Sequence, residues 1–170
     1  MNLMMLLEMA AGAYDDRVAF QNGSESLTYQ ELFDAAGALA ADLSDGRTQH
    51  LAMLDESSLA LPVAVFGASW AGVPFAPLNY RLTDPELDSL LEQLQPGRLV
   101  TDGDRAGRLG ARIDANEGDH YVSVSTTDDL LSGARAGGAS PREEPWSTEM
   151  EDTAILLFTS GTTGAPKAAV

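Results

Sequence analysis

Short apolar runs alternate with helical segments through the middle of the chain, and this alternation restricts the fold more than any other feature of the sequence. The predicted strands are 51–54, 73–78, 98–101 and 121–125, and the predicted helices between them are 58–70, 83–93 and 104–116. The runs are largely apolar, which is typical of strands that are buried on both faces. We therefore predict an α/β fold with a mostly parallel, doubly wound sheet and helices on both of its faces.

The residues before this alternation predict a helix over 3–13 and a short pair of strands over 18–27. Asn22 and Gly23 lie between the two strands and form the dipeptide that most readily adopts the positive φ of a tight turn. The first helix carries Met4, Met5 and Met9. We expect these methionines to fill the core or to contact another protomer of a homodimer.

Two helix starts have the spacing of a capping box, in which a hydroxyl and a carboxylate satisfy free backbone N–H groups. Thr28 and Glu31 predict a helix that runs to about Leu43. Thr83 and Glu86 have the same spacing and predict the start of the helix over 83–93.

The charge and the cysteine count exclude several classes of function. Ten basic residues against 26 acidic residues give a net charge of −16, which repels nucleic-acid phosphates and anionic membrane surfaces. The chain has no cysteine, so disulfides, thiolate catalysis and Cys-based metal sites are excluded. These features favour a protein of the reducing cytoplasm that binds no nucleic acid.

Two further features have an ordinary structural explanation. His50 and His120 each precede a predicted strand without a second histidine at metal-ligand spacing, so we predict no metal site there. The longest uncharged stretch, between Glu56 and Arg81, contains three prolines and two glycines that divide it into a helix, a turn and a strand. We therefore predict no transmembrane segment.

Residues 132–149 are rich in Gly, Ala, Ser and Pro and show no periodicity, which predicts an exposed connection. This places an α/β subdomain at 1–131 and a further unit at 150–170. We expect the lone aromatic residue of the connection, Trp146, to fold back onto the surface of the protein instead of serving as a recognition platform.

After this connection, the aliphatic run over 154–158 predicts a short buried strand that leads directly into a loop rich in hydroxyl groups. Its glycines let the backbone approach phosphate oxygens, and its hydroxyl and N–H groups are donors suited to a polyanion. Lys167 is the only lysine in the chain and supplies a cation at the end of this loop. The candidate phosphate-binding residues are Thr159, Ser160, Gly161, Thr162, Thr163, Gly164 and Lys167.

The loop differs from the P-loop of Walker type, because Pro166 precedes the lysine and the glycines are spaced differently. A proline at this position also disfavours a helix and favours an extended exit into Ala168. We therefore predict that the loop joins two strands.

The segment LLFTSGTTGAPK resembles the signature phosphate loop of the adenylate-forming superfamily, which includes acyl-CoA synthetases and the adenylation domains of peptide synthetases. The resemblance continues upstream through LTYQEL and FGASWAGVPFAPLNYRLTDPELDSLLEQLQP. The segment PLNYRLTDPEL is most similar to the fatty-acyl-CoA synthetase branch.

This resemblance implies an ATP-dependent fatty-acid–CoA ligase, whose large N-terminal domain begins with this α/β subdomain. Its partners would be a carboxylate substrate, ATP with Mg²⁺, and coenzyme A, and the seven loop residues would hold the β and γ phosphates. Catalytic residues are expected beyond Val170, so the chain is expected to be the inactive N-terminal portion of such an enzyme. The alternative is a non-catalytic α/β module for protein contact or for nucleotide or pyrophosphate binding.

Overall fold

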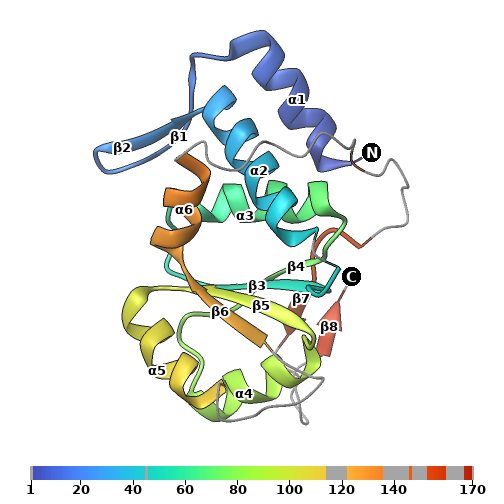
Figure 1. Cartoon of the computed structure of the whole chain (residues 1–170), viewed down its shortest axis with the longest axis vertical. Coiled ribbons are helices and arrows are strands. Elements are labelled where there is room, and N and C mark those ends of the chain that lie inside the picture. Colours follow the sequence, from blue (N-terminus) through green and yellow to red (C-terminus); the bar gives the residue numbers. More distant parts are fainter. Residues whose placement is uncertain are drawn as a thin grey trace.

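A four-stranded parallel sheet forms the centre of the computed structural model, which describes residues 2–44, 46–113, 122–135, 146, 153–159 and 167–169. The strand order is β4-β3-β5-β6, and every neighbouring pair is parallel (Figure 1). The strands are β3 (His50–Leu54), β4 (Phe75–Pro77), β5 (Gly97–Thr101) and β6 (Val122–Thr126), and the helices that connect them are α3 (Ala60–Ala71), α4 (Asp84–Gln93) and α5 (Gly103–Ile113). The predicted parallel sheet is confirmed.

Helices cover both faces of this sheet. In Figure 1, α2 (Tyr29–Leu43), α3 and α6 (Thr127–Arg135) lie on one face, and α4 and α5 lie on the other. The chain passes from β3 outward to β4, returns past β3 to β5 and continues to β6. This reversal of direction is the mark of a doubly wound fold and confirms the predicted class.

Each strand supplies side chains to both helical layers, because successive residues of a strand point to opposite faces. Leu51 and Met53 of β3 join the core against α2 and α3, whereas Ala52 and Leu54 join the core against α4 and α5. We call these the α2–α3 core and the α4–α5 core. A fully buried leucine contributes about 1.5–3 kcal/mol, so apolar strands are stable only where both faces are covered.

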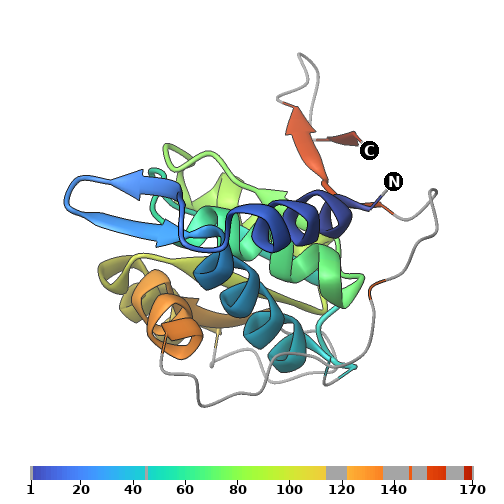
Figure 2. The same cartoon turned by 90° about the horizontal axis from the view of Figure 1, so that it is seen from above.

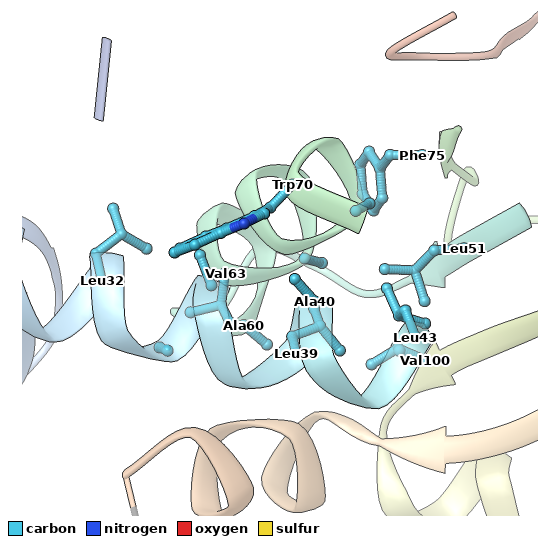
Figure 3. Packing of buried hydrophobic residues seen from close by; sticks show 14 of the residues in the cluster. Leu32, Leu39, Ala40, Leu43, Leu51, Ala60, Val63, Trp70, Phe75 and Val100 are labelled. Carbon is cyan, nitrogen blue, oxygen red and sulfur yellow. The ribbon is translucent and has the colours of Figure 1, made fainter. Parts of the chain in front are cut away.

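Helices α2 and α3, on one face of the sheet, pack closely together (Figure 3). Gly67 of α3 lies against Leu39 of α2, so closely that a Cβ atom built at position 67 would stand 2.9 Å from the Cβ of Leu39. The buried residues labelled in Figure 3 are Leu32, Leu39, Ala40, Leu43, Leu51, Ala60, Val63, Trp70, Phe75 and Val100.

The N-terminal elements form a separate layer at one end of the molecule. They are α1 (Leu3–Tyr14) and the antiparallel strands β1 (Val18–Asn22) and β2 (Glu25–Thr28), which meet at the predicted Asn-Gly turn. Met4 is buried, whereas Met5 and Met9 are exposed. One methionine therefore fills the core, and the other two lie on the surface.

Both predicted capping boxes are present. At the start of α2, the Thr28 N–H donates to the Glu31 Oε2 at 2.8 Å, and the Glu31 N–H donates to the Thr28 Oγ1 at 3.1 Å. At the start of α4, the N–H and Oγ1 of Thr83 both donate to the Glu86 Oε2, at 2.8 and 2.7 Å. These bonds lower the pKa of Glu86, because they stabilise its ionised carboxylate.

Helix α6 was not predicted from the sequence, and it continues over 132–135 into the stretch assigned to the exposed connection. The Asp129 N–H donates to the Thr126 Oγ1 at 2.9 Å, and the Thr126 N–H donates to the Asp129 Oδ2 at 3.3 Å. This is a capping arrangement with Asp in place of Glu. Within the described residues, no helix has both the length and the apolar character needed to span a bilayer.

Candidate functional site

The two ends of the predicted phosphate loop are brought together by a pair of short antiparallel strands, β7 (Leu157–Thr159) and β8 (Lys167–Ala169). Thr159 lies directly opposite Lys167 in the ladder, so this pair joins the two ends of the loop. The predicted strands before and after the loop are therefore confirmed, and residues 160–166 between them lie outside the described residues.

The structure describes Thr159 and Lys167 through their backbone. The other candidate residues lie outside the described residues, and their role in phosphate binding stays a prediction. They are Ser160, Gly161, Thr162, Thr163 and Gly164.

The chain leading into β7 is attached to β4, the edge strand of the main sheet. Ile155 forms a parallel bridge with Phe75. The Phe75 N–H donates to the Ala154 carbonyl oxygen at 2.9 Å, and the Leu156 N–H donates to the Phe75 carbonyl oxygen at 2.8 Å. Figure 2 shows β7 and β8 extending outward from the α/β body, so the loop ends are held at its periphery.

The prediction of a buried strand over 154–158 was wrong. Leu156 and Phe158 pack against the α4–α5 core, but Ile155 and Leu157 are 36% and 54% exposed. The reason is the position of this segment beyond β4, where one of its faces is covered and the other is open. Aliphatic content indicates a strand here but not how many of its faces are buried.

Trp146 folds back onto the helical layer, as predicted. Its ring meets the ring of Trp70 edge-on, with centroids 5.5 Å apart and an interplanar angle of 89°. Trp70 also lies 5.0 Å from the ring of Phe33 of α2. These three aromatic residues belong to or pack against the α2–α3 core.

The carboxyl ends of β3 and β5 bring together polar residues that sequence reasoning did not identify. The Thr101 Oγ1 is buried and donates to the Leu54 carbonyl oxygen at 2.8 Å. Asp102 follows β5 and accepts from the Arg105 N–H at 2.9 Å, which caps the start of α5. Asp55 follows β3, and its Oδ2 is buried without a hydrogen-bond partner among the described residues. The available signal was their placement at the end of an apolar strand or immediately after it.

The described residues contain no candidate metal centre. In that part of the chain, no group of three or more His, Asp or Glu side chains is arranged to hold a metal ion. His50 is the first residue of β3, and its Nδ1 is buried without a hydrogen-bond partner there. His120 lies outside the described residues.

The residue types of the predicted phosphate loop support anion binding. Hydroxyl groups and glycine N–H groups are donors, and the ammonium of Lys167 is a cation in a chain of net charge −16. An anionic ligand would be repelled by the protein as a whole. Its binding therefore depends on donors and a cation gathered at one place.

Comparison with known proteins assigns this fold and loop to a family. The family described as AMP-binding enzyme matches residues 7–170. The medium/long-chain-fatty-acid–CoA/3-oxocholest-4-en-26-oate–CoA ligase of Mycobacterium tuberculosis strain H37Rv is 29% identical over an alignment of 178 residues. This alignment covers 98% of this chain and 32% of the ligase. The N-(5-amino-5-carboxypentanoyl)-L-cysteinyl-D-valine synthase of Amycolatopsis lactamdurans is 33% identical over 168 residues, which cover 96% of this chain and 4% of the synthase.

A solved structure shares the architecture as well. VinN in complex with 3-methylaspartate superimposes with a TM-score of 0.79 at 28% identity, covering 96% of this chain and 45% of VinN. The chain thus spans about a third of the fatty-acid–CoA ligase that it matches and under half of VinN. It belongs to the AMP-binding enzymes, the family whose signature loop its sequence resembles.

Proposed function

We propose that this chain is the N-terminal, phosphate-binding part of an ATP-dependent acyl-CoA ligase. The observation that carries the proposal is the loop of hydroxyl, glycine and lysine residues whose ends meet at the Thr159–Lys167 pair, in a chain of the AMP-binding family. Thr159, Ser160, Gly161, Thr162, Thr163, Gly164 and Lys167 would hold the β and γ phosphates of ATP.

The proposed reaction has two steps. A carboxylate oxygen of the substrate attacks the α-phosphorus of ATP, and pyrophosphate leaves. The sulfur of coenzyme A then attacks the acyl carbonyl carbon, loses its proton, and displaces AMP. The first step brings a carboxylate next to a polyanion, so donors that neutralise the β and γ phosphates lower its barrier. Mg²⁺ would arrive with ATP as part of the substrate.

A fatty acid is the proposed carboxylate. The M. tuberculosis relative is named as a medium/long-chain-fatty-acid–CoA ligase, and the segment PLNYRLTDPEL resembles the sequence of the fatty-acyl-CoA branch. We also propose a cytoplasmic enzyme, supported by the absence of cysteine. The exposed Met5 and Met9 of α1 are compatible with the proposed homodimer.

The proposed domain division places an α/β subdomain at 1–131, a connection at 132–149 and the start of the phosphate-binding unit at 150. It is supported by the buried members of the two cores, which all precede residue 131 among the described residues, whereas Trp146, Leu156 and Phe158 only pack against these cores. Helix α6 nevertheless extends to Arg135, so the connection would start four residues later than proposed.

The first prediction tests Lys167 by exchange of labelled pyrophosphate into ATP. The assay uses the product of the whole reading frame that contains this chain, with a fatty acid as substrate. We expect Lys167→Ala to reduce exchange by roughly tenfold or more, since one charge-assisted contact is worth about 1.5–3 kcal/mol. Lys167→Arg should restore part of the rate, because it retains the charge.

Arg17→Ala is the matched control. It also removes one positive charge, but Arg17 is exposed and lies over the ring of Tyr14, in the N-terminal layer. Exchange in this variant should equal that of the wild type. Unchanged exchange in Lys167→Ala would remove Lys167 from the mechanism.

A second candidate function is activation of an amino acid. It is favoured by the 33% identity with the A. lactamdurans synthase and by the likeness to VinN, whose complex holds 3-methylaspartate. The same assay separates the candidates, because exchange driven by amino acids but not by fatty acids would favour this one. Pyrophosphate binding without exchange on either substrate class would favour the non-catalytic module.

A further inference from the structure

The two tryptophans of the chain contact each other across a long sequence separation. Trp70 is near the C-terminal end of α3 and is 5% exposed. The centroid of its ring is 5.0 Å from that of Phe33 of α2 and 5.5 Å from that of Trp146. Trp146 therefore adds to an aromatic cluster that is already part of the α2–α3 core.

The chain attaches to the same corner of the fold a second time before it reaches β7. Residues 154–156 are joined to Phe75 of β4 by two backbone hydrogen bonds, which form the parallel bridge between Ile155 and Phe75. Phe75 follows Trp70 by five residues, because β4 comes directly after α3. The corner formed by α3 and β4 thus holds the incoming chain at both Trp146 and residues 154–156.

The second attachment covers only one face of the segment. Leu156 and Phe158 pack against the α4–α5 core, whereas Ile155 and Leu157 on the opposite face are 36% and 54% exposed. The contact of Trp146 with Trp70 shortens the span that must be closed, since seven residues separate Trp146 from Ala154.

We infer that Trp146 is a positioning residue: by docking on Trp70, it holds the chain leading into β7 against β4 and thereby fixes the start of the phosphate loop. The consequence for phosphate binding rests on the proposed function. The inference concerns a residue outside the loop, and it does not require Trp146 to touch ATP.

Hydrogen exchange at the Leu156 amide tests the anchoring directly. In Trp146→Ala, we expect this amide to exchange about two- to tenfold faster, the factor that corresponds to the loss of one aromatic pair. The amides of β3 and β5 should keep their wild-type rates, whereas a general loss of stability would speed them as well. Trp146→Phe should restore most of the protection, because a smaller ring still packs on Trp70.

Met9→Ala is the matched control, because it truncates a large apolar side chain that is 70% exposed on α1. It should leave Leu156 exchange unchanged. Wild-type exchange at Leu156 in Trp146→Ala would overturn the inference. So would acceleration at Leu156 that is matched in β3 and β5.

Pyrophosphate exchange in the product of the whole reading frame tests the consequence for the loop. We expect Trp146→Ala to raise the KM for ATP several-fold while changing kcat less, with recovery in Trp146→Phe. An unchanged KM together with faster Leu156 exchange would overturn the link to phosphate binding. A wild-type protein that shows no exchange would contradict the proposed function instead, and Leu156 would still decide whether Trp146 anchors β7.

Discussion

Gly67 shows how a single hydrogen atom in place of a side chain sets the distance between two helices. A Cβ atom at this position would stand 2.7–2.9 Å from the Cβ, Cγ and Cδ2 atoms of Leu39. The Cβ of Leu39 is fixed to the backbone of α2, so rotation of the side chain cannot relieve the contact. The α2–α3 core therefore depends on glycine at position 67.

We predict that Gly67→Ala lowers the free energy of unfolding by about 1–3 kcal/mol, the usual cost of overpacking a core. Urea denaturation measures this loss. Gly12→Ala in α1 is the control, because a Cβ there meets nothing within 4 Å. It should stabilise the protein by up to about 1 kcal/mol, as alanine favours helix more than glycine does. Equal stability of Gly67→Ala and the wild type would mean that separating the helices costs no more than the helix propensity that alanine adds, about 1 kcal/mol.

At the scale of elements, the start of α4 depends on the ionisation of Glu86. The N–H and Oγ1 of Thr83 both donate to its carboxylate, which lowers the pKa of Glu86. A carboxyl group with a lowered pKa in the folded state stabilises the protein above its unfolded pKa. This stabilisation is lost as the pH falls through the folded pKa. The helix start is therefore strongest near neutral pH and weakens in acid.

Thr83→Ala should raise the pKa of Glu86 toward its ordinary value, because the hydroxyl contributes the larger of the two effects. The backbone N–H of residue 83 remains, so part of the lowering should persist. Thr83→Ser keeps the hydroxyl and should keep the pKa low. An NMR titration of the Glu86 carboxyl carbon measures each value, and an unaltered pKa in Thr83→Ala would exclude the hydroxyl as the cause.

Elements with local signals could be predicted from the sequence, and those that depend on distant partners could not. The capping boxes at Thr28 and Thr83 each involve residues three positions apart, so their spacing is visible in the sequence. The Thr126 cap of α6 has the same spacing but is followed by a short helix among small residues, and it was missed. The exposure of Leu157 could not be predicted, because it depends on which strand lies beside it.

The candidate site could be proposed from the sequence because its residue types and spacing are unusual. Its attachment to the rest of the fold could not be predicted. Four hydroxyl residues, two glycines and the lone lysine fall within nine positions. By contrast, the Trp146–Trp70 contact and the bridge from Ile155 to Phe75 join residues far apart in the chain. Nothing in the local sequence of one partner indicates the other.

For the whole molecule, the balance of charge opposes folding at low ionic strength. The chain carries 26 acidic and ten basic residues, and its net charge of −16 produces repulsion among carboxylates over the surface. Asp15 and Asp16 follow the C-terminus of α1, where the helix dipole is also negative. Repulsion of this kind is screened by salt, because the Debye length falls from about 10 Å at 0.1 M to about 3 Å at 1 M.

We therefore predict that Tm rises by about 2–4 °C between roughly 0.1 and 1 M NaCl, the shift that about 1 kcal/mol produces in a protein of this size. Differential scanning calorimetry measures the rise. The double substitution Asp15→Asn and Asp16→Asn removes two adjacent exposed charges, so it should raise Tm at low salt and flatten the salt dependence. The same rise in the double variant and the wild type would show that these two charges contribute nothing. A Tm that falls with NaCl would mean that attractive ion pairs, such as that between Arg98 and Asp42, outweigh the repulsion of the surplus carboxylates.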